Sequence, residues 1–435
     1  MALFHIGLDD TDSLKKGCTT YIAALLVEAL NKDATFVDYP NLIRLNPNIP
    51  WKSRGNAAVC LRIRSDKDAD YLLDMVTNYV KEYRDREDPK NQPGIALLKG
   101  EIPSQVKDFG KRALYDVLSF EEAMSIAEKV KVRYSLINGG RGFIGALASI
   151  GNTLEGDHTF ELAVYRRKEL WGSVRSVNLD SVIKMDKASA PLTFNNVDYE
   201  KGRVLITPHG PDPVLFGIRG EDPTILLDAL KKVEFEGAER WVIYRSNQGT
   251  DVHLSCSQRV ADLKPHQAAV IEGIVSAKPK AITGGHIISA ITDGSGNIDI
   301  AAYEPSGGFR TIVKGLRRGD MIRAYGGVRV LDGNKFTFNL EKLEILDLVE
   351  ENQRNPLCPE CNKRMKSEGK EKGYQCKKCG IKSASIVIEK TERALKKRIY
   401  LPPARAMRHL AKPVQRYGME KSSWDSKVGL YHGFF

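Results

Sequence analysis

Four cysteines in the C-terminal quarter of the chain have the spacing of a metal site. They form two CxxC pairs, Cys358 with Cys361 and Cys376 with Cys379, and 14 residues lie between the pairs. Zn²⁺ binds four thiolates in a tetrahedron, and a hairpin of this length brings the second pair back to the first. Because four thiolates leave no coordination position open, we expect a structural zinc ion. The alternative is four free cysteines that have this spacing by chance.

Basic residues surround these cysteines. Residues 355–416 contain 17 Lys or Arg and 5 Asp or Glu, a net charge of +12, whereas the whole chain carries +11. A basic end beside a near-neutral body is typical of a polyanion contact, although a solubilising tail has the same composition. Tyr374 lies between the two cysteine pairs, in what would be a zinc ribbon. It can stack on an unpaired base, or it can belong to the core of that ribbon. We expect the following residues to bind RNA: Lys363, Arg364, Lys366, Tyr374, Lys377, Lys378, Lys396, Lys397 and Arg398.

Three carboxylates lie within four residues near the start of the sequence. Asp9, Asp10 and Asp12 follow directly on a short strand predicted at residues 5–8. Mg²⁺ uses one or two protein carboxylates and takes its other ligands from water and phosphate. We therefore predict that these three residues form a Mg²⁺ site. The alternative is a solvated acidic turn in which Asp12 or Ser13 caps the next helix.

A glycine-rich segment at residues 138–145 opens a predicted helix. Glycines let backbone N–H groups approach phosphate oxygens, and the helix N-terminus adds a favourable dipole. The Lys-Ser/Thr pair of a Walker A loop is absent, and a tight turn would use the same glycines. With the acidic cluster, the segment favours nucleotide-dependent phosphoryl transfer. The candidate phosphate ligands are Gly139, Gly140, Arg141, Gly142, Gly145, Arg44, Lys52 and Arg54. For Arg44, Lys52 and Arg54 the alternative is that they only solvate a loop.

The helices and strands that must position these residues indicate an α+β protein. Its 435 residues predict several domains, because a single core rarely exceeds about 250–300 residues. Strands and helices alternate over residues 1–195, which predicts an α/β domain. Residues 196–265 suit a ferredoxin-like layer. Five short strands with glycine turns over 266–347 favour an OB-fold β-barrel. The zinc ribbon then occupies 355–390, and a basic tail occupies 391–435.

The hydrophobic pattern places four helices in the first domain. Apolar residues recur at helical spacing, most clearly along one face of residues 69–83. The predicted helices cover 20–30, 69–83, 113–130 and 144–150, and strands are predicted at 57–63 and 160–165.

Membrane and secretory signals are missing from the sequence. No run approaches the roughly 20 apolar residues that a membrane helix needs, and residues 1–8 lack the pattern of a signal peptide. The paired cysteines indicate a metal site in a reducing compartment. We therefore expect a cytoplasmic protein without a membrane partner, and no obligate protein partner is evident.

Several motifs that occur in order resemble those of the archaeal isoleucine-tRNA 2-agmatinylcytidine synthetases over nearly the whole chain. Beside the barrel and the ribbon, they are GLDDTDS (7–13) with CTT (18–20), RLNPNIP (44–50) with Lys52 and RGN (54–56), GRGFIGA (140–146), DHTFE (157–161), GPDPVLFGIRG (210–220), and NQGTD (247–251) with His253.

The resemblance implies a kinase-like N-terminal domain followed by a ferredoxin-like domain, an OB fold and a zinc ribbon. It implies that ATP activates the 2-oxo group of the wobble cytidine in an isoleucine tRNA with a CAU anticodon. Agmatine then displaces the activated oxygen, ATP ends as AMP and two phosphates, and the modified tRNA reads AUA. The autophosphorylated threonine of the family falls on Thr19, which would otherwise only cap a helix. Its acidic residues fall on Asp9, Asp10 and Asp12, which the resemblance assigns to Mg²⁺ and ATP.

The binding site for agmatine stays open at this stage. A guanidinium group pairs well with a planar carboxylate. Asp212 and Asp251 are candidates, with Asp157 behind them.

Two other functions remain as alternatives. A non-catalytic module that coats single strands would use the barrel and the ribbon, but it leaves the first 260 residues without a role. A protein or small-molecule kinase would use the acidic cluster and Thr19, but it does not account for the barrel and the ribbon.

Overall fold

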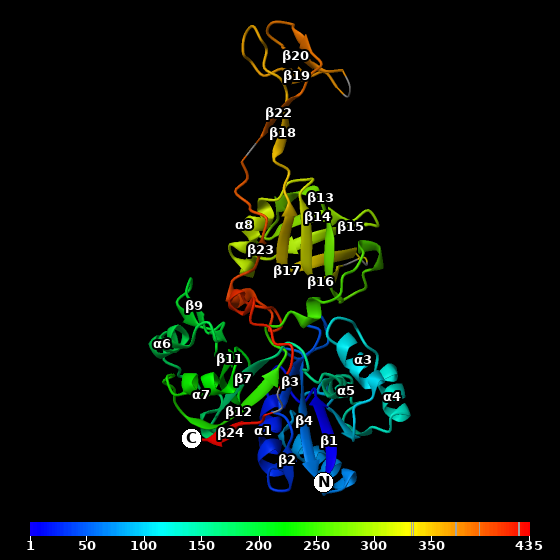
Figure 1. Ribbon diagram of the computed structural model, residues 1–435, viewed down its shortest axis with the longest axis vertical. Coiled ribbons are helices and arrows are strands. Elements are labelled where there is room, and N and C mark those ends of the chain that lie inside the picture. Colours follow the sequence, from blue (N-terminus) through cyan, green and yellow to red (C-terminus); the bar gives the residue numbers. More distant parts are fainter. Residues whose placement is uncertain (332, 334, 370–371, 391, 425–426) are drawn as a thin grey trace.

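The computed structural model describes residues 1–331, 333, 335–369, 372–390, 392–424 and 427–435. Figure 1 shows an elongated molecule with three levels. An α/β body that contains both chain ends lies at one end, a β-barrel lies in the middle, and a small ribbon lies at the far end. Parts of the predicted ribbon (370–371) and tail (391, 425–426) lie outside the described residues. No helix among the described residues is long and apolar enough to cross a membrane.

The body is built on one mixed sheet with the path β6-β5-β1-β4-β3-β12-β7-β11-β8, to which β2 adds beside β4 and β24 beside β12. Its strands are β1 (Ala2–Asp9), β2 (Ala34–Phe36), β3 (Asn41–Arg44), β4 (Ala57–Ser65), β5 (Gly94–Lys99), β6 (Arg133–Leu136), β7 (Thr159–Arg166), β8 (Thr193–Phe194), β11 (Val214–Gly220), β12 (Ala238–Ser246) and β24 (His432–Phe434). The parallel pair of β3 and β12 joins the two halves of the sheet. The strand β7, which we predicted in the first domain, pairs with β11 and β12 of the second, so one sheet continues across residue 195.

Helices cover both faces of this sheet because successive strand residues point to opposite sides. In β12, Val242 and Tyr244 belong to the core under α1 (Thr19–Leu30) and α2 (Ala69–Tyr83). On the other face, α3 (Ser104–Arg112), α4 (Phe120–Lys129) and α5 (Phe143–Gly151) cover the first half. Trp241 and Ile243 pack instead with α6 (Leu179–Ser189) and α7 (Pro223–Leu230), which cover the second half.

The middle level is a closed barrel. Its strands are β13 (Ala268–Ala281), β14 (Ile287–Thr292), β15 (Asn297–Ala302), β16 (Met321–Leu331) and β17 (Lys335–Asp347). The parallel pairing of β15 with β17 closes it, and the short helix α8 (Phe309–Lys314) lies between β15 and β16 in the chain. This arrangement is that of an OB fold and agrees with the predicted strands.

A two-stranded stalk of β18 (Glu351–Arg354) and β22 (Val387–Lys390) connects the barrel to the ribbon. The ribbon itself contains β19 (Lys366–Ser367), β20 (Tyr374–Gln375) and β21 (Lys382–Ser383), and it projects away from the rest of the molecule (Figure 1).

The region predicted as a basic tail is packed against the other domains. After the stalk, β23 (Ile399–Tyr400) pairs with β17 of the barrel. The chain then returns to the body, where β24 pairs with β12. We call residues 399–424 the strap.

The predicted helices differ from the observed ones mainly between residues 104 and 130. The helix α2 has the predicted bounds, and α1 and α5 agree within one residue at each end. The helix predicted at 113–130 is wrong in its first turns, because Ser119 accepts a hydrogen bond from the Glu122 N–H and starts α4 at Phe120. The preceding α3 was not predicted, since only Val106 and Phe109 are apolar and buried in it.

Candidate active site and zinc centre

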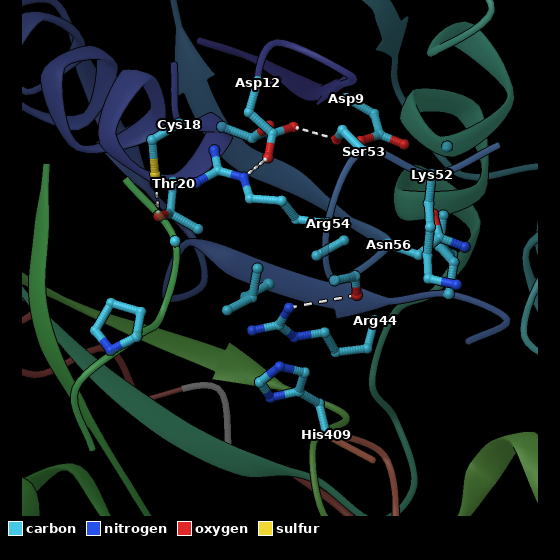
Figure 2. Close-up of a pocket in the computed structure, with 18 of the residues that line it drawn as sticks. Asp9, Asp12, Cys18, Thr20, Arg44, Lys52, Ser53, Arg54, Asn56 and His409 are labelled. Atoms are coloured by element: carbon cyan, nitrogen blue, oxygen red, sulfur yellow. Dashed lines mark hydrogen bonds and ion pairs between the residues drawn. The ribbon is translucent and has the colours of Figure 1, made fainter. Parts of the chain in front are cut away.

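A cavity of about 560 Å³ lies where the two halves of the sheet meet the strap. The loop after β1, the start of α1, the loop between β3 and β4, the start of α5 and the strap all contribute to its lining (Figure 2). Of the predicted residues, ten line this one cavity: Asp9, Asp10, Asp12, Thr19, Arg44, Lys52, Arg54, Arg141, Gly142 and Gly145. Gly139 and Gly140 do not belong to the lining; they form the turn before Arg141, where both have positive φ.

Asp9 and Asp10 form the acidic end of β1. Burial, and then the neighbouring Asp10, raise the pKa of Asp9 well above its ordinary value. Burial likewise raises the pKa of Asp10 to about 6, although Arg141 opposes the rise. The Arg141 Nη2 atom lies 3.7 Å from the Asp10 Oδ2 atom. Two adjacent buried carboxylates ionise together only beside positive charge, so this oxygen set fits a divalent cation.

Asp12 lies on the opposite side of the same loop and already has partners. Its carboxylate accepts hydrogen bonds from the Ser53 hydroxyl at 3.0 Å and from Arg54 Nε at 2.6 Å (Figure 2). Arg54 also donates to the Gly17 carbonyl at 2.6 Å. These contacts tie the acidic loop to the loop between β3 and β4.

Thr19 is the first residue of α1 and is buried at the cavity wall. Thr11 donates a hydrogen bond to the Thr19 hydroxyl oxygen at 3.0 Å. The N-cap position belongs to Cys18, which makes no side-chain capping bond. The Thr20 hydroxyl contacts the Cys18 Sγ atom at 3.2 Å. The helix therefore begins without a side-chain cap, and Thr19 is not in the capping position.

The start of α5 packs directly on the acidic strand end. A Cβ atom at Gly145 would lie 1.9 Å from Asp9 Oδ2, and one at Gly142 would lie 2.6 Å from the Asp9 carbonyl oxygen. Only glycine fits at these two positions. Because they have no side chain, the start of α5 approaches β1 closely, and the positive end of the helix dipole faces the carboxylate of Asp9.

The opposite wall of the cavity is basic. Lys52 donates through Nζ to the carbonyls of Pro47 and Ile49, at 2.7 and 2.9 Å. Arg44 is fixed at its backbone by the Asn247 side chain, which accepts from the Arg44 N–H at 2.8 Å and donates to its carbonyl at 2.9 Å. The Gln248 Oε1 atom accepts from Arg44 Nε at 3.2 Å.

Several lining residues were not predicted from the sequence. They come from four separate segments: Asp116 from the loop after α3, Glu161 from β7, Arg219 from β11 and His409 from the strap. Glu161 accepts a hydrogen bond from Gln248 and lies 3.7 Å from Arg44 Nη2. None of the four belongs to a short motif with a chemical signature, although Glu161 and Arg219 lie inside the family motifs DHTFE and GPDPVLFGIRG.

The three carboxylates predicted for agmatine do not line the cavity, and each binds basic groups of the chain itself. Asp157 accepts hydrogen bonds from both Nη atoms of Arg416. Asp212 accepts one from Arg166 Nη1 at 2.9 Å. Asp251 binds Lys342 and accepts a hydrogen bond from the backbone N–H of residue 412.

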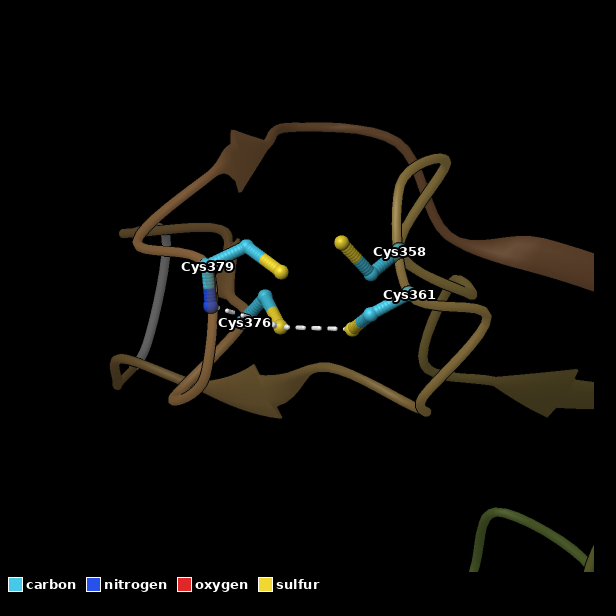
Figure 3. A group of neighbouring side chains, drawn as sticks. All are labelled: Cys358, Cys361, Cys376 and Cys379. Carbon is cyan, nitrogen blue, oxygen red and sulfur yellow. Dashed lines mark hydrogen bonds between the residues drawn. The ribbon is translucent and has the colours of Figure 1, made fainter.

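The four predicted zinc ligands converge at the tip of the molecule (Figure 3). The Sγ atoms of Cys358, Cys361, Cys376 and Cys379 all lie within 4.8 Å of one another. Tetrahedral Zn–S bonds of about 2.3 Å require sulfur separations of roughly 3.8 Å, so the set fits one zinc ion. Backbone N–H groups of residues 379 and 378 lower the pKa of Cys376 to about 6, which favours its thiolate.

Models of four known domains match the chain in the same order as this architecture. They are the TiaS TCKD domain over residues 5–67, the TiaS FLD domain over 140–253, an OB-fold nucleic acid binding domain over 269–346 and the TiaS C-terminal zinc ribbon domain over 355–395. TiaS of Methanocaldococcus jannaschii, a 2-agmatinylcytidine synthetase for isoleucine-2 tRNA, is 42% identical over an alignment of 424 residues that covers 95% of this chain and 99% of that protein. The Pyrococcus horikoshii enzyme of the same name is 42% identical over 418 residues, 95% and 97% of the two chains. The chain belongs to the TiaS family.

Solved TiaS structures share the whole architecture. TiaS in a complex with isoleucine-2 tRNA and ATP is 37% identical in sequence to this chain, with a TM-score of 0.86. The match covers 96% of this chain and 98% of that one. A complex of TiaS with isoleucine-2 tRNA, AMPCPP and agmatine is 35% identical, with a TM-score of 0.83 and the same coverage. The TiaS FLD model begins at residue 140 and so includes β7, in agreement with the pairing of β7 with β11 and β12.

In this TiaS-family chain, the residues predicted to bind RNA lie in the ribbon and where the chain rejoins the barrel. All the predicted Lys and Arg side chains there are exposed, whereas Tyr374 is half-buried and packs on the cysteine cluster. Lys377 binds Glu368 at 2.6 Å and Lys397 binds Asp347 at 2.6 Å. Lys363, Lys366 and Lys378 are exposed to solvent, and Arg364, which is also exposed, donates a hydrogen bond to the Asn355 carbonyl at 2.8 Å.

Proposed function

We propose that this chain uses ATP to replace the 2-oxo group of the wobble cytidine with agmatine in the isoleucine tRNA that has a CAU anticodon. The observation that carries this proposal is one cavity that gathers the acidic cluster, the Thr19 hydroxyl and the glycine-lined start of α5. It occurs in a chain whose relatives form complexes with isoleucine-2 tRNA, ATP and agmatine. We also propose a cytoplasmic location, because tRNA is the substrate and the four zinc thiols need a reducing compartment.

The two halves of the body take the roles of a kinase-like and a ferredoxin-like domain in this proposal. In the second half, the chain order strand, helix, strand, strand, helix, strand with the sheet order β12-β7-β11-β8 supports the ferredoxin-like interpretation. The first half contributes the acidic cluster, Thr19 and the start of α5.

Asp9, Asp10 and Asp12 hold the metal ion and ATP in this proposal. A bound Mg²⁺ neutralises negative charge on the phosphates during transfer. Arg44, Lys52, Arg54 and Arg141 line the same cavity and add positive charge toward the phosphates. Phosphorylation makes the 2-oxo oxygen a better leaving group, which is covalent activation of the base.

Thr19 accepts a phosphoryl group in the same cavity. Its position at the uncapped start of α1 supports this role, because free N–H groups and the helix dipole stabilise an added phosphate. We also propose that Asp116 and Glu161 are further candidates for binding the agmatine guanidinium, since both line the cavity whereas Asp157, Asp212 and Asp251 do not.

Two labels separate the steps of the proposed reaction. Purified protein is mixed with ATP, radiolabelled agmatine and a tRNA transcript that has either a CAU or a UAU anticodon. Agmatine should enter only the CAU transcript and only with ATP. Agmatine incorporation without ATP, or equally into both transcripts, would contradict the proposal.

A second label tests the phosphate acceptor. With γ-labelled ATP, Thr19→Ala should take no label and Thr19→Ser should take part of it, whereas Thr20→Ala should still be labelled at Thr19. Both alanine variants should melt within a few degrees of the parent, because neither residue is the cap. Phosphate found by mass spectrometry on Thr20, or normal agmatine transfer without any phosphothreonine, would contradict the role of Thr19.

A further inference from the structure

The segment between α2 and β5 lies behind the cavity and contacts two of the loops that shape it. Asn91 of this segment is 1% exposed and is not one of the residues that line the cavity. Its Nδ2 atom donates hydrogen bonds to the carbonyls of Asp10 and Asp12, at 2.9 and 3.1 Å. One buried amide therefore holds two carbonyls of the acidic loop after β1.

The same segment also binds the glycine-rich turn before α5. The Asn91 carbonyl accepts a hydrogen bond from the Asn138 side chain at 3.2 Å, and the Gln92 carbonyl accepts one from the Gly142 N–H at 2.9 Å. The Gln92 N–H donates to the Asp10 carboxylate at 3.3 Å. Residues 91 and 92 thus connect two loops that lie far apart in the chain.

Each of the two loops contains a non-glycine residue in the left-handed region of φ. Asp10 has a φ of 58° and Asn138 has a φ of 52°. This backbone conformation is unfavourable for a residue with a side chain and persists only where surrounding contacts hold it. Asn91 bonds to both residues, to Asp10 through its side chain and to Asn138 through its carbonyl.

The partners of the Asn91 side chain determine its orientation and leave no donor for a ligand. A carbonyl only accepts and a guanidinium only donates. The nitrogen therefore faces Asp10 and Asp12, and the oxygen faces Arg84, whose Nη1 atom donates to Asn91 Oδ1 at 3.3 Å. Both protons of the amide are used within the chain, so Asn91 acts on the site through the loop that it holds.

We propose that Asn91 is a positioning residue for phosphoryl transfer. It holds the acidic loop and the turn before α5 in one fixed arrangement, so that the carboxylates of Asp9 and Asp10 and the start of α5 face the same phosphates. A neutral amide does this without adding charge beside carboxylates that must bind a cation. The proposal rests on the proposed function, which assigns Mg²⁺ and ATP to this cavity.

The Mg²⁺ dependence of Thr19 labelling tests the proposal. Asn91→Ala removes the amide, and Asn91→Asp keeps its shape but turns an oxygen toward two carbonyl oxygens. In both variants, the Mg²⁺ concentration that gives half-maximal labelling of Thr19 by γ-labelled ATP should rise about 10–100-fold. This is the usual effect of losing a residue that orients metal ligands.

Hydrogen exchange measures the connection between the two loops without metal or ATP. In Asn91→Ala, peptides that cover residues 9–17 and 137–146 should both exchange faster than in the parent. A peptide that covers β7 should exchange as in the parent, because β7 does not contact Asn91. A residue that only stabilised the body as a whole would speed exchange in all three peptides.

Asn196→Ala is the matched control. Asn196 is also 1% exposed, and its Nδ2 atom donates to the side chains of Asp186 and Thr193, both at 2.9 Å. These partners lie in α6 and β8, in the second half of the sheet. Asn196→Ala should therefore keep the parent Mg²⁺ dependence and the parent exchange of residues 9–17 and 137–146.

Three outcomes would overturn the proposal: a parent-like Mg²⁺ dependence in either Asn91 variant, faster exchange in only one of the two loops, or the same rise in half-maximal Mg²⁺ in Asn196→Ala. A parent protein whose Thr19 takes no label at any Mg²⁺ concentration would instead contradict the proposed function. The exchange experiment would then still show whether Asn91 connects the two loops.

Discussion

Arg416 of the strap binds Asp157 through both terminal nitrogens of its guanidinium, at 3.1 and 2.8 Å, although the two residues are 259 positions apart in the chain. The Arg416 side chain is fully buried and also binds Glu221 and the Gly249 carbonyl. Removing one partner of a buried ion pair leaves an uncompensated charge and typically costs about 3–5 kcal/mol. We therefore expect Arg416→Ala to lower the free energy of unfolding by that amount in urea denaturation.

The matched control is Arg259→Ala, because Arg259 pairs with Asp262 at an exposed site. Exposed pairs contribute little, so this variant should unfold like the parent. Equal free energies of unfolding for Arg416→Ala and Arg259→Ala would show that Arg416 of the strap adds no stability to the body.

Gly145→Ala should impair the acidic site although alanine usually favours a helix. The added methyl group would overlap the Asp9 carboxylate, so Asp9 or α5 must move. Mg²⁺-dependent ATP binding, measured by calorimetry, should weaken at least several-fold. Gly156→Ala is the control, since its Cβ meets no atom within 4 Å. Unchanged ATP binding in Gly145→Ala would place the metal elsewhere.

Cys376→Ser should release the zinc ion and weaken tRNA binding while ATP binding is retained. Three thiolates hold zinc far less well than four, and the ribbon core consists largely of the ligands themselves. Zinc content by mass spectrometry and tRNA affinity by filter binding check this. Cys256→Ser, outside the ribbon, should keep both. Full tRNA affinity without zinc would separate the ribbon from RNA binding.

The exposed basic side chains of the ribbon should determine part of the salt dependence of tRNA binding. Each lost phosphate contact flattens the slope of log K against log salt by about 0.7–0.9. Replacing Lys363, Arg364, Lys366 and Lys378 with alanine should therefore flatten it by up to about 3.6. Alanine at Lys184 and Lys187, exposed on α6, should leave the slope unchanged. The same slope in both variants would place the RNA elsewhere.

Stability should fall with acid between about pH 6.5 and 4 because of His158. Burial lowers the pKa of His158 from 6.5 to about 4. The unfolded chain therefore binds a proton in this range that the folded chain does not, and the folded state loses on the order of 3 kcal/mol by pH 4. His158→Gln should show a shallower decline in urea midpoint over this range, even if it is less stable at pH 7. His209 is exposed, so His209→Gln should keep the slope of the parent. Identical slopes of urea midpoint against pH in all three proteins would exclude His158 as the cause of the acid sensitivity.

Motifs whose members are close in sequence predicted which of these side chains lie together. The CxxC pairs need only a hairpin to meet, and the acidic cluster needs only the end of β1. Glu161, Arg219 and His409 reach the cavity from three distant segments. Their contribution depends on how the two halves of the sheet and the strap pack together, and no local spacing encodes that packing.

The basic tail shows a second limit of reasoning from composition. A charge count treats every Lys and Arg as available to RNA. In the structure, Arg393 binds Asp320 and Arg405 binds Asp198, and both arginines are largely buried, as is Arg416. Their partners lie elsewhere in the chain, so only the fold distinguishes arginines that pair internally from those that face solvent.

The stalk below the zinc ribbon has a consequence for how such a chain can vary. The outgoing strand β18 and the returning strand β22 are antiparallel neighbours, with Arg354 opposite Val387. The chain therefore leaves and re-enters the barrel side at adjacent points. A short hairpin turn joining these two positions would bypass the ribbon without rerouting any other strand. The ribbon is thus topologically a removable insertion, and descendants of one ancestral gene can exchange, enlarge or lose it while the barrel, the strap and the cavity stay connected as before.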